Sequence, residues 1–400
     1  MTTGDNTTLH DLVQPRLDSF LRDLAELSGI DCGTYDKAGV DAAGRVMQAK
    51  LEEIGLTVER HDGGALGDTL VARGRGRGRA RVLLIGHLDT VYAAGWPAAH
   101  PFTIAGDTAH GPGTADMKGG LLAGLYALDA LRAAGFDNYD ELTFVLNSDE
   151  EIGSPSSKEL ITREARGRDA ALVLEPGRAN GDIVSARKGS AHFDLRVIGR
   201  AAHAGVEPEK GRSAVLELAH LVVALHALNG AIPGATVNVG VVEGGTRRNV
   251  VAAEAHALID VRARDQAGLD GVIAAIRAVV ATRTVPDTVA TLEGNVTHRP
   301  MEKTAASERL IEWCQEAART AGFDVADTAT GGGSDGNTTA ALGIPTLDGL
   351  GPVGGAAHNP DEYVLVSSIV PRVAMLAGLI QRICAHGVRA TFSRTEKGVD

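Results

Sequence analysis

Two ionisable residues interrupt the apolar segment RVLLIGHLDTV at residues 81–91. The segment begins as a buried strand should, and then places His87 and Asp89 among its apolar side chains. Residues two apart on a strand project from one face, so both side chains point the same way. A single histidine in a strand is usually a satisfied core residue. A carboxylate beside it, however, fixes the tautomer of a metal-binding imidazole, so the pair indicates that His87 binds metal and Asp89 orients it.

Further residues that can bind metal lie where other apolar segments end. They fall at strand ends or in glycine-rich loops of GPGTADMKGG, VLNSDEEIGS, LVLEPG and GPVGGAAHNPDEY, and are Asp116, Glu150, Glu151, Glu175 and His358. Alone, Asp116 could equally cap a helix, but charges near a core are costly and tend to pair or coordinate metal. Mixed histidine and carboxylate ligands suit zinc, and this many suggest two ions about 3.5–4 Å apart with a bridging carboxylate.

The segments around these residues predict an α/β fold. LVARG, RVLLIGHLDTV, ELTFVLNSDEE and AALVLEP have the pattern of short strands with helices between them, which favours a largely parallel sheet. Ligands of such open sheets bind at the C-terminal ends of the strands. From Gly189 the pattern changes to β-α-β-β-α-β, as in a small ferredoxin-like domain, and the α/β pattern resumes after Pro300. We therefore expect a catalytic domain of residues 1–188 and 301–400, with residues 189–300 inserted into it.

The composition excludes several classes of function. The chain has 400 residues, is 44% hydrophobic and has a formal charge of -12, which argues against nucleic acid as a partner because phosphate binding needs a basic face. The one basic run, RGRGRGRAR, is expected to form an exposed turn. Neither a secretory signal nor an apolar run of about 18 residues is apparent, so no membrane association is expected. Three widely spaced cysteines fit reduced thiols, and the expected location is cytoplasmic.

Seven motifs in order identify a family resemblance. GHLDTV, GPGTADMKGG, SDEEIGS, LEPG, RAAHAG, GGGSDG and AAHNPDEY resemble those of the dizinc metallopeptidase superfamily of glutamate carboxypeptidases, aminoacylases, acetylornithine deacetylases and succinyl-diaminopimelate desuccinylases. The similarity extends from about residue 70 to 365, and seven ordered motifs make chance agreement very unlikely. It implies a zinc-peptidase-like, three-layer catalytic domain with an inserted lid and dimerisation domain.

The resemblance assigns the metal ligands. His87 and Glu175 would hold one Zn²⁺, Glu151 and His358 the other, and Asp116 would bridge them. Co²⁺ or Mn²⁺ can substitute for zinc in such sites. In this family the peptide bond after the bridging aspartate is typically cis, which here is the bond from Asp116 to Met117.

The resemblance also assigns residues that act on the substrate. Glu150 would be the general base, and His203 in RAAHAG matches a lid histidine that reaches the active site of a partner subunit. Asn249 and Arg262 match lid residues that hold the substrate carboxylate. Arg299 matches a further substrate-binding arginine of the glutamate-releasing branch. A strand-end arginine or asparagine can instead simply pair or cap.

One departure concerns the substrate side-chain pocket. Glutamate-releasing relatives carry a lysine and a serine between LEPG and the lid. Ser185 matches the serine, but the lysine position holds Ile183, with Arg187 and Lys188 nearby. The glutamate preference is therefore open at this point.

These assignments predict a zinc-dependent hydrolase that cleaves an amide bond next to a free carboxylate. The substrate would be a peptide or N-acyl amino acid, and the enzyme a homodimer through its lid. A carboxypeptidase of glutamate type is the first interpretation, and an N-acyl-amino-acid deacylase is the alternative. A non-catalytic binding protein on the same fold is a remote third interpretation. Such a protein would be expected to have lost a metal ligand or the general base, and this sequence has all of them.

Overall fold

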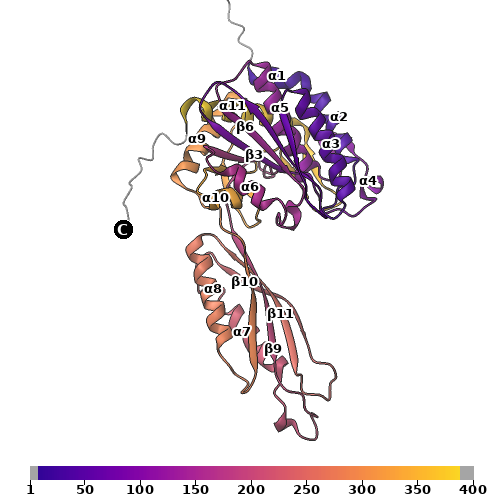
Figure 1. The fold of residues 1–400 in the computed structure, drawn as a ribbon, viewed down its shortest axis with the longest axis vertical. Coiled ribbons are helices and arrows are strands. Elements are labelled where there is room, and N and C mark those ends of the chain that lie inside the picture. Colours follow the sequence, from indigo (N-terminus) through magenta and orange to yellow (C-terminus); the bar gives the residue numbers. More distant parts are fainter. Residues whose placement is uncertain (1–7, 388–400) are drawn as a thin grey trace, which may run out of the picture. The chain divides into compact units, whose positions relative to one another are not determined.

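The computed structural model describes residues 8–387, which form two compact units. Within that range, the first unit comprises the chain up to Ser185, Lys303–Ala329 and the part from Ser334 onward, and the second comprises Ala186–Glu302 and Thr330–Gly333 (Figure 1). The chain thus leaves the first unit, builds the second, and returns.

A six-stranded mixed sheet forms the centre of the first unit. Its strand order is β1 (Thr57–His61), β2 (Thr69–Arg75), β6 (Glu141–Asn147), β3 (Arg81–His87), β7 (Ala170–Val173) and β14 (Thr346–Leu347). Strands β6, β3, β7 and β14 pair in parallel, whereas β1 and β2 pair antiparallel with their neighbours. The prediction of a largely parallel sheet is confirmed.

Helices cover both faces of this sheet because alternate strand residues are apolar on both sides (Figure 1). Leu84 and Phe144 belong to the core with α2 (Leu17–Ser28), α3 (Lys37–Glu53), α5 (Gly119–Ala133), α9 (Ala305–Thr320) and α11 (Val366–His386). Ile85 and Val145 belong to a second core with α6 (Lys158–Ala165). Helix α10 (Asp335–Ala341) packs against α6 and β7. The result is the three-layer arrangement that the resemblance implied.

Helix α11 is long and apolar enough to cross a membrane, but 67% of its most apolar window is buried within the protein. It also contains Pro371 and the buried Arg372. Its hydrophobicity is therefore explained by its place in the core.

Short elements that the sequence pattern did not predict support the loops of the first unit. A four-stranded sheet has the order β15 (Gly354–Gly355), β16 (Tyr363–Leu365), β5 (Thr108–His110) and β4 (Thr103–Ala105). It joins the segment before Asp116 to the segment after His358, because Tyr363 pairs with His110. The remaining elements are α1 (Leu9–Val13), η1 (Gln14–Arg16), α4 (Trp96–Ala99), η2 (Thr114–Lys118), η3 (Glu150–Ile152), and the paired strands β8 (Ile183–Arg187) and β13 (Asp327–Thr330).

The second unit has the ferredoxin-like topology. Its elements are β9 (Gly189–Ile198), η4 (Pro208–Lys210), α7 (Ala214–His226), β10 (Thr236–Gly244), β11 (Glu254–Ala263), α8 (Gln266–Ala281) and β12 (Val289–His298). The sheet order β10-β11-β9-β12 is antiparallel throughout, so each helix connects two strands with a third between them. Alternating residues of β9, such as Phe193 and Leu195, form a separate core with Leu218 of α7 and Ile276 of α8.

The edges of this unit differ from the expected 189–300. It begins at Ala186 and ends at Glu302, and it also includes Thr330–Gly333. The reason is local pairing: the backbone N–H of Lys188 donates to Thr330 at 3.1 Å, and the Arg187 guanidinium donates to the Gly332 carbonyl at 3.1 Å. Directly after this segment, Ser334 caps the start of α10.

Candidate active site

His87 and Asp89 lie together at the C-terminal end of β3, and both are buried. Nδ1 of His87 lies 2.9 Å from the Asp89 carbonyl oxygen and 3.3 Å from its carboxylate Oδ1. The other ring nitrogen, Nε2, faces Asp116 at 3.1 Å and Glu175 at 3.7 Å. One nitrogen of the imidazole thus contacts the orienting aspartate while the other is directed into a group of carboxylates.

The carboxylate of Asp116 lies between two histidines. Its Oδ1 is 3.1 Å from Nε2 of His87, and its Oδ2 is 3.4 Å from Nε2 of His358. Asp116 is not a helix cap, because Lys118 holds that position of α5. The bond from Asp116 to Met117 is cis, as the resemblance implied. Burial alone would raise the pKa of Asp116, but hydrogen bonds with His358 and His87 outweigh it and hold the pKa below its ordinary value.

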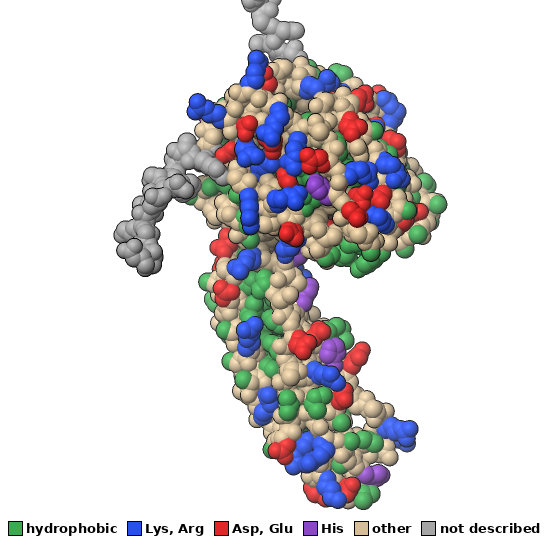
Figure 2. Space-filling model, in the orientation of Figure 1, with side chains coloured by type: hydrophobic (Ala, Val, Ile, Leu, Met, Phe, Trp, Pro, Cys, Tyr) green, Lys and Arg blue, Asp and Glu red, His purple; other side chains and the backbone are tan. Residues whose placement is uncertain are grey.

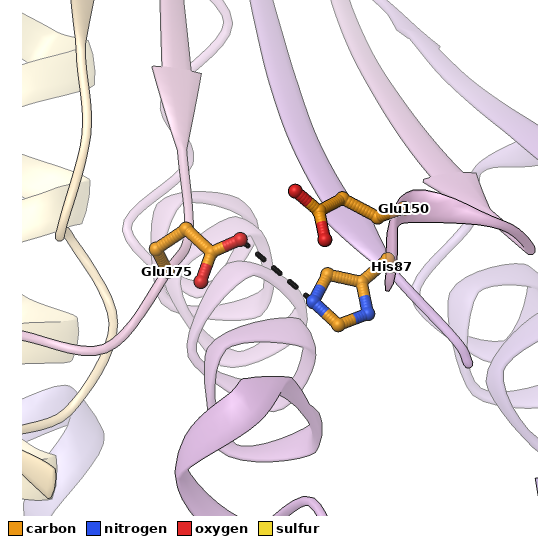
Figure 3. Close-up of side chains that lie close together, drawn as sticks. All are labelled: His87, Glu150 and Glu175. Atoms are coloured by element: carbon orange, nitrogen blue, oxygen red, sulfur yellow. Dashed lines mark ion pairs between the residues drawn. The ribbon is translucent and has the colours of Figure 1, made fainter. Parts of the chain in front are cut away.

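Glu150 and Glu151 diverge from the turn that ends β6. Oε2 of Glu151 lies 3.1 Å from Nε2 of His358. Glu150 instead groups with His87 and Glu175, with ligand atoms of all three within 4.8 Å of one another (Figure 3). Burial, together with the nearby charges of Glu175, Asp335 and Asp116, raises the pKa of Glu150 well above its ordinary value. The two neighbours in sequence therefore serve different parts of the cluster.

The donor set suits metal ions. His87, Asp116 and Glu151 form a second group whose ligand atoms lie within 4.8 Å of one another. Hydrogen bonds to the carboxylates of Asp116 and Glu151 raise the pKa of His358 to about 10, so this imidazole lies in strongly negative surroundings. Imidazole nitrogens and several carboxylates converging on one volume are the ligands that zinc prefers, and cations would offset the crowded negative charge.

Asp89 has a further role that the sequence did not indicate. Its Oδ1 accepts the backbone N–H of Glu150 at 3.2 Å, and its Oδ2 accepts that of Glu151 at 3.2 Å. Thr34 donates its hydroxyl to Oδ2 at 2.7 Å. A threonine 55 residues away in the chain carries no local signal of such a contact.

Glu362 was also missed. It is 1% exposed, and its carboxylate accepts the backbone N–H groups of Gly113, Ala115 and Asp116 at 2.9 Å each. It also accepts the Tyr92 hydroxyl at 2.6 Å. The motif HNPDEY contains Glu362 beside Asp361, but nothing local distinguishes the buried acid from its exposed neighbour.

Two other buried aspartates support the turn that carries Glu150 and Glu151. Asp149 accepts the hydroxyl of Ser156 at 2.7 Å and that of Ser157 at 2.5 Å. Asp335 accepts hydrogen bonds from Asn147 and from Ser154. Burial raises the pKa of Asp335 to about 6. Asp335 belongs to the motif GGGSDG, for which the sequence alone predicted no role.

The remaining residues with predicted roles in substrate binding lie mostly in the second unit. His203 and Asn249 are exposed neighbours there: His203 forms a backbone bridge with Val250, and the N–H of Ala204 donates to the Asn249 carbonyl at 3.0 Å. Arg262 pairs with Asp260 at 3.0 Å, and Arg299 is exposed after β12. In the first unit, Ser185 is buried and donates its hydroxyl to Asp327.

The sequence model of peptidase family M20/M25/M40 matches residues 83–382. The chain belongs to this family. It is accordingly a metallopeptidase or amidohydrolase, and members of the family use metal ions in hydrolysis.

Relatives within the M20 family differ in their named activities. The chain is 33% identical to carboxypeptidase G2 of Pseudomonas sp. (strain RS-16), over 91% of this chain and 89% of that protein. It is 29% identical to acetylornithine deacetylase of Myxococcus xanthus, over 84% of this chain and 90% of that protein. The crystal structure of a tripeptidase from Staphylococcus aureus matches with a TM-score of 0.79 at 22% identity, covering 92% and 99% of the two chains, which shows that the M20 fold is shared.

Proposed function

We propose that this M20 enzyme is a dizinc carboxypeptidase that releases a C-terminal amino acid, glutamate in type, from a peptide or N-acyl conjugate. The observation that carries the metal part is the position of Asp116, whose two oxygens face two different imidazoles. A carboxylate in this place can bridge two ions. His87 and Glu175 would hold one Zn²⁺, and Glu151 and His358 the other, with Co²⁺ or Mn²⁺ able to substitute.

Bound zinc would lower the pKa of a water molecule toward neutrality and polarise the scissile carbonyl. Glu150, half-buried beside His87 and Glu175, accepts the proton of the attacking water and returns it to the leaving amine nitrogen. Its pKa is raised above the ordinary value by burial, the direction that favours uptake of a proton by a general base. Asp89 keeps His87 in one orientation during this exchange.

The proposed roles of the second unit rest on the family resemblance of its polar residues. His203 would act at the active site of a partner subunit, where its imidazole would donate a hydrogen bond to the developing oxyanion. Asn249 and Arg262 would hold the free carboxylate of the substrate, since a guanidinium group recognises a carboxylate in two-pronged geometry, and Arg299 would be a further substrate-binding arginine.

The surface of the second unit supports a homodimer. Helix α7 exposes Val215, Leu216 and Val223, which are 42%, 51% and 72% exposed, and Val242 of the edge strand β10 is 55% exposed. An edge strand beside an apolar helix is a surface that a second copy can cover about a two-fold axis. Figure 2 shows acidic and basic side chains interspersed on the face of each unit that it draws, which supports neither nucleic acid nor a membrane as the partner.

One observation favours the alternative, an N-acyl-amino-acid deacylase. The hydroxyl of Ser185 is occupied by Asp327, which also pairs with Lys303 at 2.9 Å. Ile183, at the position of the expected lysine, is fully buried. Of the two side chains that would recognise a glutamate side chain, the serine is therefore already hydrogen-bonded and the lysine is replaced by isoleucine.

The test is a substrate panel. The zinc-loaded enzyme would be assayed against N-acetyl, N-succinyl and N-benzoyl amino acids and against dipeptides with different C-terminal residues, with Glu150→Gln as the matched inactive control. Preference for dipeptides and acyl-glutamates supports the carboxypeptidase. Hydrolysis confined to N-acetyl or N-succinyl amino acids with other side chains would establish the deacylase instead.

A further inference from the structure

We infer that Glu362 is a positioning residue that joins three metal-ligand segments and sets the affinity of the second metal site, made by Asp116, Glu151 and His358. The inference rests on the proposed dizinc function. The Glu362 carboxylate belongs to neither group of candidate metal ligands. Its position is fixed by hydrogen bonds within the first unit.

Both oxygens of the Glu362 carboxylate are fully used. Oε1 accepts the N–H groups of Ala115 and Asp116, each at 2.9 Å, and Oε2 accepts the N–H of Gly113 at 2.9 Å and the Tyr92 hydroxyl at 2.6 Å. Only a carboxylate offers two acceptor oxygens in this geometry, because a glutamine amide would direct an NH₂ group at one pair of donors. The contacts therefore depend on the acid and not merely on its size.

These four donors come from two chain segments that carry metal ligands. Tyr92 lies five residues after His87, in the loop that follows β3, and the other three donors are Asp116 itself and its neighbours Gly113 and Ala115. Glu362 lies four residues after His358. One buried side chain thus connects the segment of His87, the segment of Asp116 and the loop of His358.

The loop of His358 needs such an anchor. Ala356 and His358 have positive φ values of 55° and 64°, a region that residues with side chains rarely occupy. The loop is held by the Asn359 N–H, which donates to Ala356 at 3.1 Å, and by the Glu362 N–H, which donates to Asn359 at 3.0 Å. His358 is also the most solvent-accessible ligand, with a side chain 53% exposed, so packing does little to fix it.

The first metal site has independent support. His87 ends β3 and is held by Asp89, and the carbonyl oxygen of Glu175 accepts the N–H of Gly351 at 2.9 Å. Loss of the Glu362 carboxylate should therefore displace two ligands of the second ion, Asp116 and His358, but only one ligand of the first, the shared Asp116, while His87 and Glu175 stay in place. The expected consequence is selective loss of the second ion.

The experiment compares stepwise metal binding in three variants. Chelator-stripped protein would be titrated with Zn²⁺ against a chromophoric indicator, and with Co²⁺ to follow the visible absorption of each equivalent. Glu362→Gln replaces one acceptor oxygen, which serves a pair of donors, with an NH₂ group, and Tyr92→Phe removes one donor and keeps three. Glu217→Gln is the matched control, because Glu217 is equally buried and accepts backbone N–H groups of Thr284 and Val285 within the second unit.

In Glu362→Gln we expect the second zinc to bind about 10- to 100-fold more weakly, the usual effect of losing a partner behind a metal ligand. The affinity for the first zinc should stay within about threefold of the parent value, and the visible spectrum of the second Co²⁺ equivalent should change. Tyr92→Phe should weaken binding of the second zinc only, and by a smaller factor than Glu362→Gln does. Glu217→Gln should leave both unchanged.

Equal weakening of both sites, or no change at either, would overturn the inference. If Glu362→Gln fails to fold, an unchanged second-zinc affinity in Tyr92→Phe would overturn it. A parent protein that binds fewer than two zinc ions would instead refute the dizinc proposal itself, so the two failures are distinguishable.

Discussion

The carboxylate of Asp89 accepts the backbone N–H of Glu150 at 3.2 Å. The same oxygen lies 3.3 Å from Nδ1 of His87. A single buried acid therefore sets both the orientation of a proposed zinc ligand and the backbone position of the proposed general base. Any change to it should affect metal binding and proton transfer together.

Asp89→Asn should lower zinc affinity by about 10- to 100-fold and should also lower kcat when metal is saturating. The amide keeps the shape of the side chain but turns one acceptor oxygen into an NH₂ group that faces donors. Thr34→Val, which removes one hydrogen bond to Asp89, is the milder control. An unchanged kcat in zinc-saturated Asp89→Asn would contradict the proposal that Asp89 also positions the general base.

Glu150→Gln should reduce kcat by about 10²- to 10⁴-fold with metal content nearly unchanged, since its proposed role is proton transfer. Glu151→Gln should instead lose metal, because Glu151 faces His358. Metal analysis beside steady-state kinetics separates the two. If Glu150→Gln instead loses metal and regains activity with added zinc, Glu150 is the metal ligand and Glu151 the general base.

Subunit mixing tests the composite active site. His203→Ala and Glu150→Ala chains should each be inactive alone. After subunit exchange, a mixed dimer has one site that combines intact Glu150 with the partner's intact His203, so up to about half of the parental activity should return in that dimer. A monomer in solution, or demonstrated exchange without recovery, would exclude the proposal.

Acid stability should depend on Glu141. Burial alone would raise the pKa of this carboxyl, but hydrogen bonds from Arg168 and Thr143 outweigh it and lower the pKa to about 2. Since an unfolded glutamate has a pKa of about 4.3, Glu141 stabilises the fold above about pH 4.3, and this contribution is lost as the pH falls toward 2.

Glu141→Gln should therefore lower the free energy of unfolding at pH 7 by about 3 kcal/mol, because the buried Arg168 loses its closest carboxylate, at 2.5 Å, and keeps the more distant one of Glu164, at 3.4 Å. The difference from the parent should shrink steadily below pH 4.3. Urea unfolding at several pH values measures this. Glu59→Gln is the control, because the Glu59 side chain is 53% exposed and should contribute little. A difference that is independent of pH would rule out this linkage.

Arg372→Met should destabilise the first unit by at least about 3 kcal/mol, because carbonyl groups would lose their donors in a dry environment. The buried guanidinium donates to Gly351 at 2.6 Å, to Gly181 at 2.7 Å and to Gly349. Arg372→Lys should recover part of the loss. Unfolding midpoints in urea measure the effect, and a midpoint unchanged in Arg372→Met would show that water replaces the donor.

The sequence predicted those parts of the site whose signal is local. His87, Glu150 and Glu175 stand out because charges are unusual at the ends of apolar strands, and the alternating pattern of β9 predicted the second unit. The partners that position the ligands could not be predicted in the same way. Glu362 meets Gly113 across 249 residues and Asp335 meets Asn147 across 188, and only the packed fold brings such residues together. The short strands β4, β5, β15 and β16 have two or three residues each, which is too few for a periodic pattern.

The first unit is assembled from chain segments on both sides of the inserted unit. A ribosome that adds ~5–20 residues per second needs roughly 10–40 s to pass from Glu175 to His358. During that interval the nascent chain contains Glu175 and the earlier carboxylates but not the loop of His358. Strand β7 also lacks its outer neighbour, because β14 has not yet been synthesised. An open parallel edge can pair with other chains. This edge of β7 therefore stays available to other chains until β14, on the far side of the inserted unit, has been synthesised.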